Sequence, residues 1–553
     1  MIKITLLEEE MLQVVFNYYE EYITKMRLVP GARFNQRRKC WEVPLKSFPV
    51  LEKIFKGEIV YVTPRSVISG QPEPNHHSDI VEIKNIHTAL PLYDFQKFGA
   101  SFLYQRAKQN GFAFLCDATG IGKTAQALGA LLLLSPKRTL VVTPAAVRHQ
   151  WAADAIPKFL KKADVVEVEG PQQQRLKLYG AAEITVANYE ALLRDADRIP
   201  KDVRFELIIL DECQKVKNHQ GKTYGALKRL LRRMSPICFF LTATPMMNNL
   251  DELYALFELA SPGFFGKYSA YAREYMRIDY SPGYPRLIGY RNLDQLTEKI
   301  APYILRRTER HPEVASALPQ LSVQNVYIEP SGQQKRVHAA IYSEWKKAVE
   351  EQRLCRDTAE EIEARCRGYI MLMQGAADDL RLFHMSDSKM AQKYIEICPS
   401  PAPSPKLMYL TEMVADLVPQ GKVAIFTCFE RMARLIADAL KAYNPALFTG
   451  KNKAFRNEEL KRFWHDSFCR VLVLTDAGGV GLNIQRARFL VNFDLPWSPG
   501  QLEQRYGRIK RFGGCYSSIV GINLISRDMI DERIFAALEQ KQEILKTILA
   551  AAS

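Results

Sequence analysis

The sequence predicts an α/β protein made mainly of two lobes, each a parallel β-sheet covered by helices. Two series of short, almost wholly apolar runs support this fold class, one between residues 112 and 241 and the other between residues 423 and 525. Segments with helical periodicity separate the runs. Strands of a parallel sheet are buried on both faces and show this near-continuous apolarity, whereas half-exposed strands alternate apolar and polar residues.

The length of the chain agrees with a division into several domains. At 553 residues the chain is too long for a single hydrophobic core. Changes in composition predict a small N-terminal α+β module at 1–62, a linker rich in Pro, Ser and His at 63–88, a first lobe at 89–300, a helical insertion and linker at 301–400, and a second lobe at 401–553.

Bulk composition narrows the class of protein. Apolar residues make up 47% and charged residues 25%, which are globular values. The net charge of +15 favours a polyanionic partner, although a basic excess is also common on a merely soluble surface. The ten cysteines are dispersed without a CxxC pair, which argues against zinc and structural disulfides. The N-terminus lacks a signal-peptide pattern, so we expect a cytoplasmic (bacterial or phage-like) or nuclear protein that is not secreted.

The stretch Gly111–Leu134, which reads GFAFLCDATGIGKTAQALGALLLL, is expected to organise the first lobe. A short apolar run is followed by a glycine-bearing turn and then by an Ala- and Leu-rich helix. Gly120 and Gly122 let the backbone wrap closely around an anion, and the amides that open the helix point at it. Lys123 adds positive charge for the outer phosphates, and Thr124 would place its hydroxyl on a magnesium ion.

Two features bear on this prediction of a phosphate loop. Asp117 stands where the strict Walker pattern has a glycine, so the loop needs support from elsewhere in the chain. The run FELIILDECQ ends a predicted strand in two carboxylates, and ligands bind at the carboxyl ends of such strands. We expect Asp211 to hold magnesium and Glu212 to orient and deprotonate the attacking water. A solvated acidic turn is the alternative for an isolated Asp-Glu pair.

The second lobe has no GKT sequence of its own but carries two polar motifs. In TDAGGVGLN, residues 475–483, glycines let the backbone approach a ligand. In QLEQRYGRIKR, residues 501–511, Arg505 and Arg508 lie on one side of a predicted helix. Planar guanidinium groups suit the charge of a transferring γ-phosphoryl group. A basic helix of this kind is also common as a solvated surface or as a nucleic-acid contact.

The N-terminal module contains a predicted hairpin within residues 28–45, LVPGARFNQRRKCWEVPL. Two extended segments flank a polar turn and carry Phe34 and Trp41 among mostly basic side chains. Aromatic rings interleaved with cations suit single-stranded or distorted nucleic acid, where bases stack and phosphates pair with the cations. The alternative is that the two rings form the core of a very small domain.

Taken together, these segments resemble the superfamily 2 helicase-like ATPases of the Swi/Snf type. The resemblance extends from Leu90 to the C-terminus, and its motifs occur in the family's order. They are LPLYDFQKFGASFL, DATGIGKT, TPAAVRHQW, DECQ, LTATPMMNN, ILRRTER, TDAGGVGLN and FDLPWSPGQLEQRYGR. The resemblance implies two RecA-like lobes with helical insertions, and ATP and Mg²⁺ as ligands.

The resemblance also assigns roles residue by residue. It implies catalysis by Lys123, Glu212, Arg505 and Arg508, and magnesium binding by Thr124 and Asp211. Residues implied to bind ATP are Gln96, which reads adenine, and the loop residues Thr119, Gly120, Ile121, Gly122, Lys123, Thr124 and Ala125. Residues implied to contact DNA are Thr143, Pro144, Asn188, Tyr189, Thr427, Thr449 and Thr475 with its neighbours.

The sequence departs from the family at three positions and extends it at the N-terminus. Cys213 and Gln214 replace the usual Ala or Gly and His of the acidic box, and Gly507 replaces a usual His. The N-terminal segments PGARF and KCWEVPL resemble the HARP module that precedes the ATPase of annealing helicases. This second resemblance implies that Arg33 and Trp41 contact DNA.

The function expected from these observations is a DNA-dependent ATPase that translocates on double-stranded or branched DNA without sequence preference. An annealing or fork-remodelling motor is the specific form that the N-terminal resemblance favours. Alternatives are an ATP-driven remodeller of nucleoprotein, a strand-separating DNA or RNA helicase and, without enzymatic activity, a DNA-binding scaffold that holds ATP.

Overall fold

The structure is a computed structural model in which the chain divides into two compact units. It describes residues 2–8, 11–16, 20–36, 38–56, 58–61, 76–243, 250–279, 286–308, 311–315, 318–354, 359–450, 456–476, 484–512 and 514–549. Unit 1 comprises residues 1–118, 122–308 and 540–553, and unit 2 comprises residues 119–121 and 309–539. Among the helices described, none is long and apolar enough to cross a membrane.

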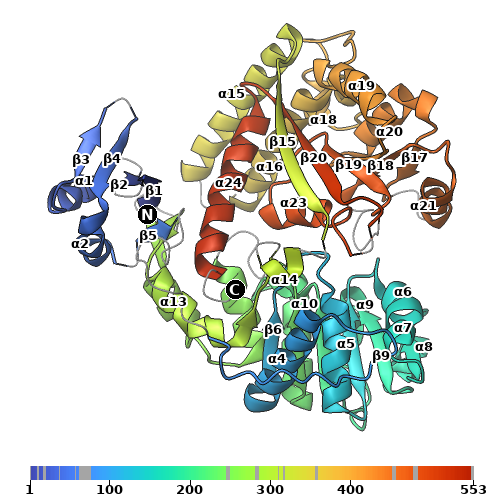
Figure 1. The fold of residues 1–553 in the computed structure, drawn as a ribbon. Coiled ribbons are helices and arrows are strands. Elements are labelled where there is room, and N and C mark those ends of the chain that lie inside the picture. Colours follow the sequence, from blue (N-terminus) through green and yellow to red (C-terminus); the bar gives the residue numbers. More distant parts are fainter. Residues whose placement is uncertain are drawn as a thin grey trace. The chain divides into compact units, whose positions relative to one another are not determined.

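The N-terminal module is a small five-stranded sheet with two helices (Figure 1). The predicted hairpin is present, because its strands pair antiparallel with Phe34 opposite Trp41. Three strands that the sequence pattern did not reveal complete the sheet. The order is β3-β4-β2-β1-β5, with β1 Ile2–Glu8, β2 Met11–Val15, β3 Arg33–Asn35, β4 Cys40–Pro44 and β5 Ile59–Tyr61, accompanied by α1 Glu20–Arg27 and α2 Phe48–Ile54.

Unit 1 is built on a seven-stranded sheet in which every pairing is parallel. Five of its strands are the apolar runs predicted from the sequence, and the two edge strands, β8 and β14, are additional. The order is β14-β6-β11-β10-β7-β9-β8, with β6 Phe112–Leu115, β7 Thr139–Thr143, β8 Val165–Glu167, β9 Ile184–Asn188, β10 Leu207–Asp211, β11 Ile237–Leu241 and β14 Ile304–Leu305.

Helices cover both faces of this sheet, as expected for strands of continuous apolarity. Successive residues of one strand enter two different cores, so that Phe114 packs with α10 and α11 while Leu115 packs with α4 and α5. The helices of unit 1 after the N-terminal module are α4 Asp94–Asn110, α5 Lys123–Leu134, α6 Arg148–Gln150, α7 Ile156–Phe159, α8 Gln172–Leu178, α9 Tyr189–Asp195, α10 Lys222–Met234, α11 Leu250–Ala260, α12 Tyr268–Tyr275 and α13 Leu293–Ile300. A two-stranded hairpin, β12 Met276–Asp279 and β13 Arg286–Tyr290, precedes α13.

Unit 2 contains a six-stranded sheet that is also parallel throughout. Five strands match the predicted runs of the second lobe. The sixth, β15, lies in the segment 301–400 that was expected to be helical, and it escapes the pattern because it is an edge strand with a mostly exposed, polar surface. The order is β15-β20-β19-β16-β18-β17, with β15 Gln320–Ile328, β16 Lys422–Thr427, β17 Ala446–Phe448, β18 Val471–Thr475, β19 Ala487–Asn492 and β20 Ser518–Ser526.

The helices of unit 2 likewise pack on both faces of its sheet. The two longest helices of the segment 301–400, predicted as a helical insertion and linker, are α15 and α16. The helices are α14 Pro312–Ala315, α15 Gly332–Leu354, α16 Ala359–Asp378, α17 Arg381–His384, α18 Lys389–Gln392, α19 Pro405–Leu417, α20 Glu430–Ala439, α21 Arg456–His465, α23 Pro499–Tyr506 and α24 Ile530–Leu549. Residues of α24 up to 539 belong to unit 2, and those from 540 belong to unit 1.

A buried ion triad joins the inserted helices to the rest of unit 2. Nζ of Lys406, on α19, lies 3.0 Å from Asp378 at the end of α16 and 2.7 Å from Asp531 on α24. All three side chains are at most 2% exposed. Because a buried charge is tolerated only with a partner, this triad fixes the mutual positions of the three helices.

Candidate active site

The phosphate loop lies between β6 and α5, where the sequence places it. Gly120 and Gly122 have φ angles of 88° and 86°, in the left-handed region that glycine tolerates best. Nζ of Lys123 donates to the backbone carbonyl oxygens of Asp117, at 2.7 Å, and of Ala118, at 3.2 Å. The loop therefore curls around a fixed ammonium group at the amino end of a helix, which is an arrangement suited to phosphate.

Gln96 lies against the phosphate loop. Its side chain is 5% exposed, and its Oε1 accepts a hydrogen bond of 3.1 Å from the backbone N–H of Tyr93 at the start of α4. A β-carbon added to Gly122 would lie only 2.4 Å from Nε2 of Gln96. The glycine thus permits the close approach of the amide side chain that the sequence assigns to adenine.

Asp211 ends strand β10 and is held by three donors. Its Oδ2 accepts hydrogen bonds from the Trp151 indole N–H at 2.7 Å and from the Thr143 hydroxyl at 3.2 Å. The Tyr189 hydroxyl donates to the backbone carbonyl of Asp211 at 2.8 Å. Trp151 was not predicted as a site residue, although it lies in the quoted motif TPAAVRHQW, and Tyr189 was predicted only as a DNA contact.

The carboxylates of Asp211 and Glu212, at the end of β10, repel each other. The pKa of Asp211 is raised to about 6, mainly by burial and secondly by the negative charge of Glu212. The positive charge of Lys123 acts to lower it. Glu212 has a φ of 51°, and its Oε2 accepts a hydrogen bond of 2.6 Å from Nε2 of Gln214. The glutamine that departs from the family pattern therefore orients the carboxylate expected to act as the base.

The residues of this edge fit a magnesium ion bound in the manner of phosphate-loop ATPases. A half-buried pair of carboxylates that repel each other is the chemistry that a divalent cation stabilises. The residues that would hold the ion are Asp211, at the end of β10, and Thr124, in the first turn of α5. Within the described part of the chain no group of three or more His, Cys, Asp or Glu side chains is placed so that it could hold a metal ion.

Asp117, which replaces the glycine of the strict Walker pattern, forms a buried ion pair with Arg307, a residue far away in the sequence. Its side chain is fully buried and accepts hydrogen bonds from the guanidinium of Arg307 at 2.7 and 3.2 Å and from the backbone N–H of Arg307 at 2.9 Å. Gln126 on α5 donates to Asp117 at 3.0 Å and accepts from Arg307 at 2.6 Å. Arg307 also donates to the carbonyl of Phe95 on α4. One buried ion pair therefore joins the phosphate loop, α4, α5 and the segment after β14.

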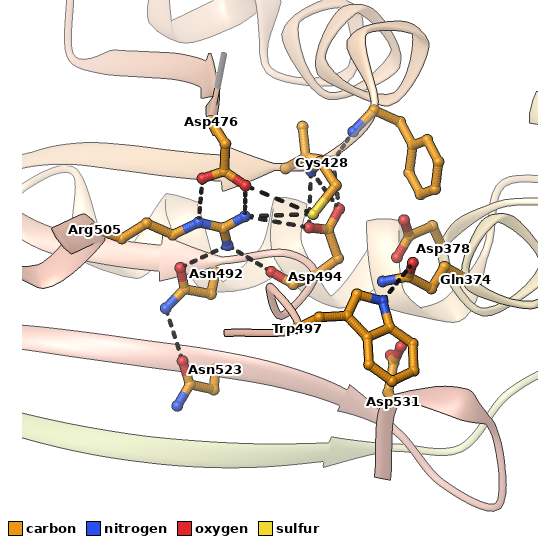
Figure 2. Close-up of polar contacts among 12 residues, drawn as sticks. Gln374, Asp378, Cys428, Asp476, Asn492, Asp494, Trp497, Arg505, Asn523 and Asp531 are labelled. Carbon is orange, nitrogen blue, oxygen red and sulfur yellow. Dashed lines mark hydrogen bonds and ion pairs between the residues drawn. The ribbon is translucent and has the colours of Figure 1, made fainter. Parts of the chain in front are cut away.

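Unit 2 carries the two candidate arginines at the end of α23. Figure 2 shows that Arg505 is enclosed by polar side chains, with Asp476 as its bidentate partner at 2.7 Å for both contacts. Burial acts to lower the pKa of Arg505, but Asp476 and the neighbouring groups outweigh it and raise that pKa. Arg508 follows in the next turn and is 7% exposed.

The threonines expected at DNA are largely internal. The Thr143 and Thr427 hydroxyls are fully buried and donate to Asp211 and to Asp494, the latter at 2.5 Å. Thr449 and Thr475 are 1% and 4% exposed. Asn188 is half-buried. It is the N-cap of α9, where its side chain accepts a hydrogen bond from the backbone N–H of Ala191. The assignment of these residues to DNA stays a prediction.

The N-terminal pair of expected DNA contacts lies on the hairpin of the first sheet. Arg33 is exposed, and Trp41 is half-buried against Phe34 with ring centroids 5.6 Å apart. Phe34 itself is 52% exposed, and Trp41 packs on the core of the module. Trp41 thus contributes to the core of the module while Phe34 faces solvent, and contact of this hairpin with DNA stays a prediction.

Comparison with known families identifies the two parallel-sheet lobes. The SNF2-related domain family matches residues 95–378, and the family described as helicase conserved C-terminal domain matches residues 405–513. The chain belongs to the SNF2 family. The resemblance to Swi/Snf-type helicase-like ATPases of superfamily 2 is therefore confirmed, together with the α/β fold of two parallel-sheet lobes.

Individual SNF2 relatives are distant in sequence. The chain is 25% identical over 461 residues to an uncharacterised ATP-dependent helicase of Bacillus subtilis, YqhH, covering 80% of this chain and 77% of that protein. It is 25% identical over 537 residues to the mouse DNA repair and recombination protein RAD54B, covering 87% of this chain but only 60% of that protein. The solved SWI2/SNF2 ATPase core of Sulfolobus solfataricus in complex with double-stranded DNA is 22% identical, with a TM-score of 0.41 and coverage of 85% of this chain and 95% of that one. The resemblance of residues 28–45 to a HARP module stays a prediction.

We expect Asp117→Gly, which would make the loop match the strict Walker pattern, to destabilise the protein. The substitution leaves the guanidinium of Arg307 buried without its carboxylate, which costs about 3–5 kcal/mol when one partner of a buried pair is removed. Thermal unfolding followed by circular dichroism should show a midpoint lowered by about 5 °C or more.

The matched control for this prediction is Asp197→Gly. Asp197 pairs with Arg229 at 2.7 Å, but both side chains are about 60% exposed, so we expect a loss of at most about 1 kcal/mol. Equal unfolding temperatures for Asp117→Gly and the wild type would show that the buried pair does not hold the loop.

The raised pKa of Asp211 predicts a pH-dependent effect of Asp211→Asn on the nucleotide-free protein. A carboxyl group whose pKa is raised by folding stabilises the folded state below its ordinary pKa, and this contribution is lost as the pH rises through about 6. The variant lacks the buried charge, so without magnesium at pH 8 it should unfold a few degrees above the wild type, with little difference near pH 4.

Asp197→Asn serves as the control for charge removal alone. Its hydrogen bond from Arg229 lowers the pKa of Asp197, so the same pH series should show no gain in stability. An Asp211→Asn variant that is less stable than the wild type at pH 8 would contradict the repulsion between the two carboxylates.

Proposed function

We propose that this SNF2-family chain is a DNA-dependent ATPase that translocates on double-stranded or branched DNA. The observation that carries the ATPase part is the arrangement in unit 1, where Lys123 is fixed inside a glycine loop and acts electrostatically on the carboxylate that ends β10. A solvated acidic turn does not explain why this half-buried carboxylate lies within the electrostatic reach of Glu212 and Lys123.

In the proposed reaction, Lys123 and the loop amides bind the β- and γ-phosphates of ATP, and Gln96 binds the adenine. Magnesium, bound through Thr124 and Asp211, would neutralise charge that develops on the phosphate oxygens. Glu212, oriented by Gln214, accepts a proton from a water molecule whose oxygen attacks the γ-phosphorus. The bond from that phosphorus to the bridging oxygen breaks, and ADP and phosphate leave.

Arg508 and Arg505 are proposed to act on the transferring phosphoryl group, as the family motif implies. A guanidinium group stabilises the charge spread over the equatorial oxygens in the transition state. In this proposal both arginines are needed for turnover, either by contacting the phosphoryl group or by positioning the residue that contacts it.

DNA is the proposed polyanion. The excess of Lys and Arg over Asp and Glu, 76 against 61, favours phosphate backbones, and the name of one relative, RAD54B, refers to DNA repair and recombination. Backbone contacts carry no sequence information, so translocation is proposed to be indifferent to sequence. The finer proposal is an annealing or fork-remodelling motor, in which the exposed Arg33 and the hairpin ring of Trp41 direct the enzyme to branched DNA.

Lys123→Ala and Glu212→Gln should each lower the kcat for ATP hydrolysis by at least about 100-fold, because they remove the phosphate-binding cation and the base. Unfolding temperatures near that of the wild type would show that the fold is intact. Phosphate release is the measurement, and Lys228→Ala, which lies on the surface of α10, is the control expected to retain full turnover. Normal turnover by either site variant would refute the assigned role.

ATP hydrolysis should rise when DNA is added, and the stimulation should fall as salt rises from about 50 to 200 mM, since phosphate contacts release counterions. Titration with single-stranded, duplex and forked DNA separates the DNA classes, and a chain that begins at Ile83 tests the N-terminal module. We expect fork preference in the full chain and its loss in the shortened one. No stimulation by any DNA would exclude a DNA motor, whereas equal fork preference in both chains would exclude only the role of the module.

A further inference from the structure

Arg505 has no hydrogen-bonding capacity left for a ligand. Its Nε and Nη2 donate to the two carboxylate oxygens of Asp476, both at 2.7 Å. Its Nη1 donates to Oδ1 of Asn492 at 3.0 Å and to the backbone carbonyl of Asp494 at 2.7 Å, and Nη2 also lies 3.5 Å from Sγ of Cys428. A guanidinium group has five N–H donors, and these contacts occupy all of them.

The surroundings of Arg505 make it a buried residue rather than an exposed finger. The residue is 2% exposed, and its guanidinium carbon lies 5.3 Å from the centroid of the Phe426 ring. A second carboxylate, that of Asp494, lies 3.7 Å from Nη2. Releasing the guanidinium to meet a phosphate would leave both Asp476 and the buried Asp494 without their cation, which is unfavourable.

The partners of Arg505 come from the ends of three neighbouring strands. Cys428 follows β16, Asp476 follows β18, and Asn492 ends β19, and these strands are adjacent in the order β19-β16-β18. Arg505 itself lies in the last turn of α23, and the backbone N–H of Arg508 donates to its carbonyl at 3.1 Å. One side chain therefore connects the carboxyl edge of the sheet to the turn that carries Arg508.

Asp476 is the accessible carboxylate of this set, and the neighbouring Cys428 is exposed as well. The Asp476 side chain is 29% exposed, whereas Asn492 and Asp494 are at most 1% exposed. It directly follows Thr475, in the motif TDAGGVGLN that is expected to meet DNA. A displacement at this edge of the sheet reaches Arg505 first through Asp476, because both of its carboxylate oxygens are bound to that guanidinium.

We infer that Arg505 is a positioning residue which acts through Asp476, and that the pair transmits the presence of DNA at the end of β18 to Arg508. This inference rests on the proposed function and changes the role of one residue in it: Arg508 alone contacts the transferring phosphoryl group. The Asp476–Arg505 pair sets where Arg508 stands when DNA is bound, and so sets the degree to which DNA stimulates ATP hydrolysis.

Asp476→Asn tests the inference, because the substitution keeps the size of the side chain and removes the charge that binds Arg505. The measurement is steady-state ATP hydrolysis by the full chain with and without saturating duplex DNA, expressed as the ratio of the two kcat values. We expect the ratio to fall by about 5- to 150-fold, the range of common coupling free energies, while the KM for ATP changes by less than about threefold. Arg505→Lys, which cannot bind Asp476 with two parallel N–H groups, should lower the ratio as well.

Two further variants separate positioning from other roles. Asp476→Glu keeps the charge and should retain more of the DNA stimulation than Asp476→Asn does. Arg508→Gln should lower kcat with and without DNA to a similar extent and leave the ratio close to that of the wild type. Unfolding temperatures of all variants identify any effect that arises from a loss of folded protein.

Three outcomes would overturn the inference. Asp476→Asn with unchanged or increased DNA-stimulated turnover would mean that the freed guanidinium of Arg505 acts directly on phosphate. Equal loss of both rates, together with a lower unfolding temperature, would mean that the pair is only structural. A wild-type enzyme without DNA stimulation would refute the proposed function itself, and the inference with it, and is recognised before any variant is measured.

Discussion

A buried arginine bound to a carboxylate stands at the carboxyl end of each parallel sheet, and the polar residues around it depend on that ion pair. In unit 1 the pair is Arg307 with Asp117, and in unit 2 it is Arg505 with Asp476. The cause is common to both lobes. Parallel strands buried on both faces deliver their polar residues to one edge, where water is scarce and each charge needs a partner of opposite sign.

The sequence predicts a large part of this architecture. Strands with continuous apolarity, such as Leu207–Asp211 and Val471–Thr475, were identified because both of their faces are buried. The phosphate loop was identified because glycine, lysine and threonine are required there by local backbone geometry and charge. The edge strands β8 and β15 were missed, because a strand with one open edge and a polar surface leaves no apolar run to detect.

The hydrogen-bond networks around the site residues could not be predicted from local sequence patterns. Asp117 looked like a defect in a phosphate-binding motif until its partner, 190 positions away, supplied the reason. Thr143 and Thr427 were assigned to DNA by their motifs, yet their hydroxyls are bound inside the fold to Asp211 and Asp494. A motif shows which residue types accompany a chemistry, but the hydrogen-bond partner that decides the direction of a side chain is set by the tertiary fold.

The position of β20 in its sheet affects the order in which the two sheets can form during translation. All seven strands of the unit 1 sheet lie between residues 112 and 305, so that sheet is complete as soon as this stretch has left the ribosome. The sheet of unit 2 has β20, residues 518–526, between β15 and β19, and β15 pairs with it over its full length. Until residues 518–526 have been translated, β15 has no neighbouring strand in this sheet, and its open edge can pair with other nascent chains.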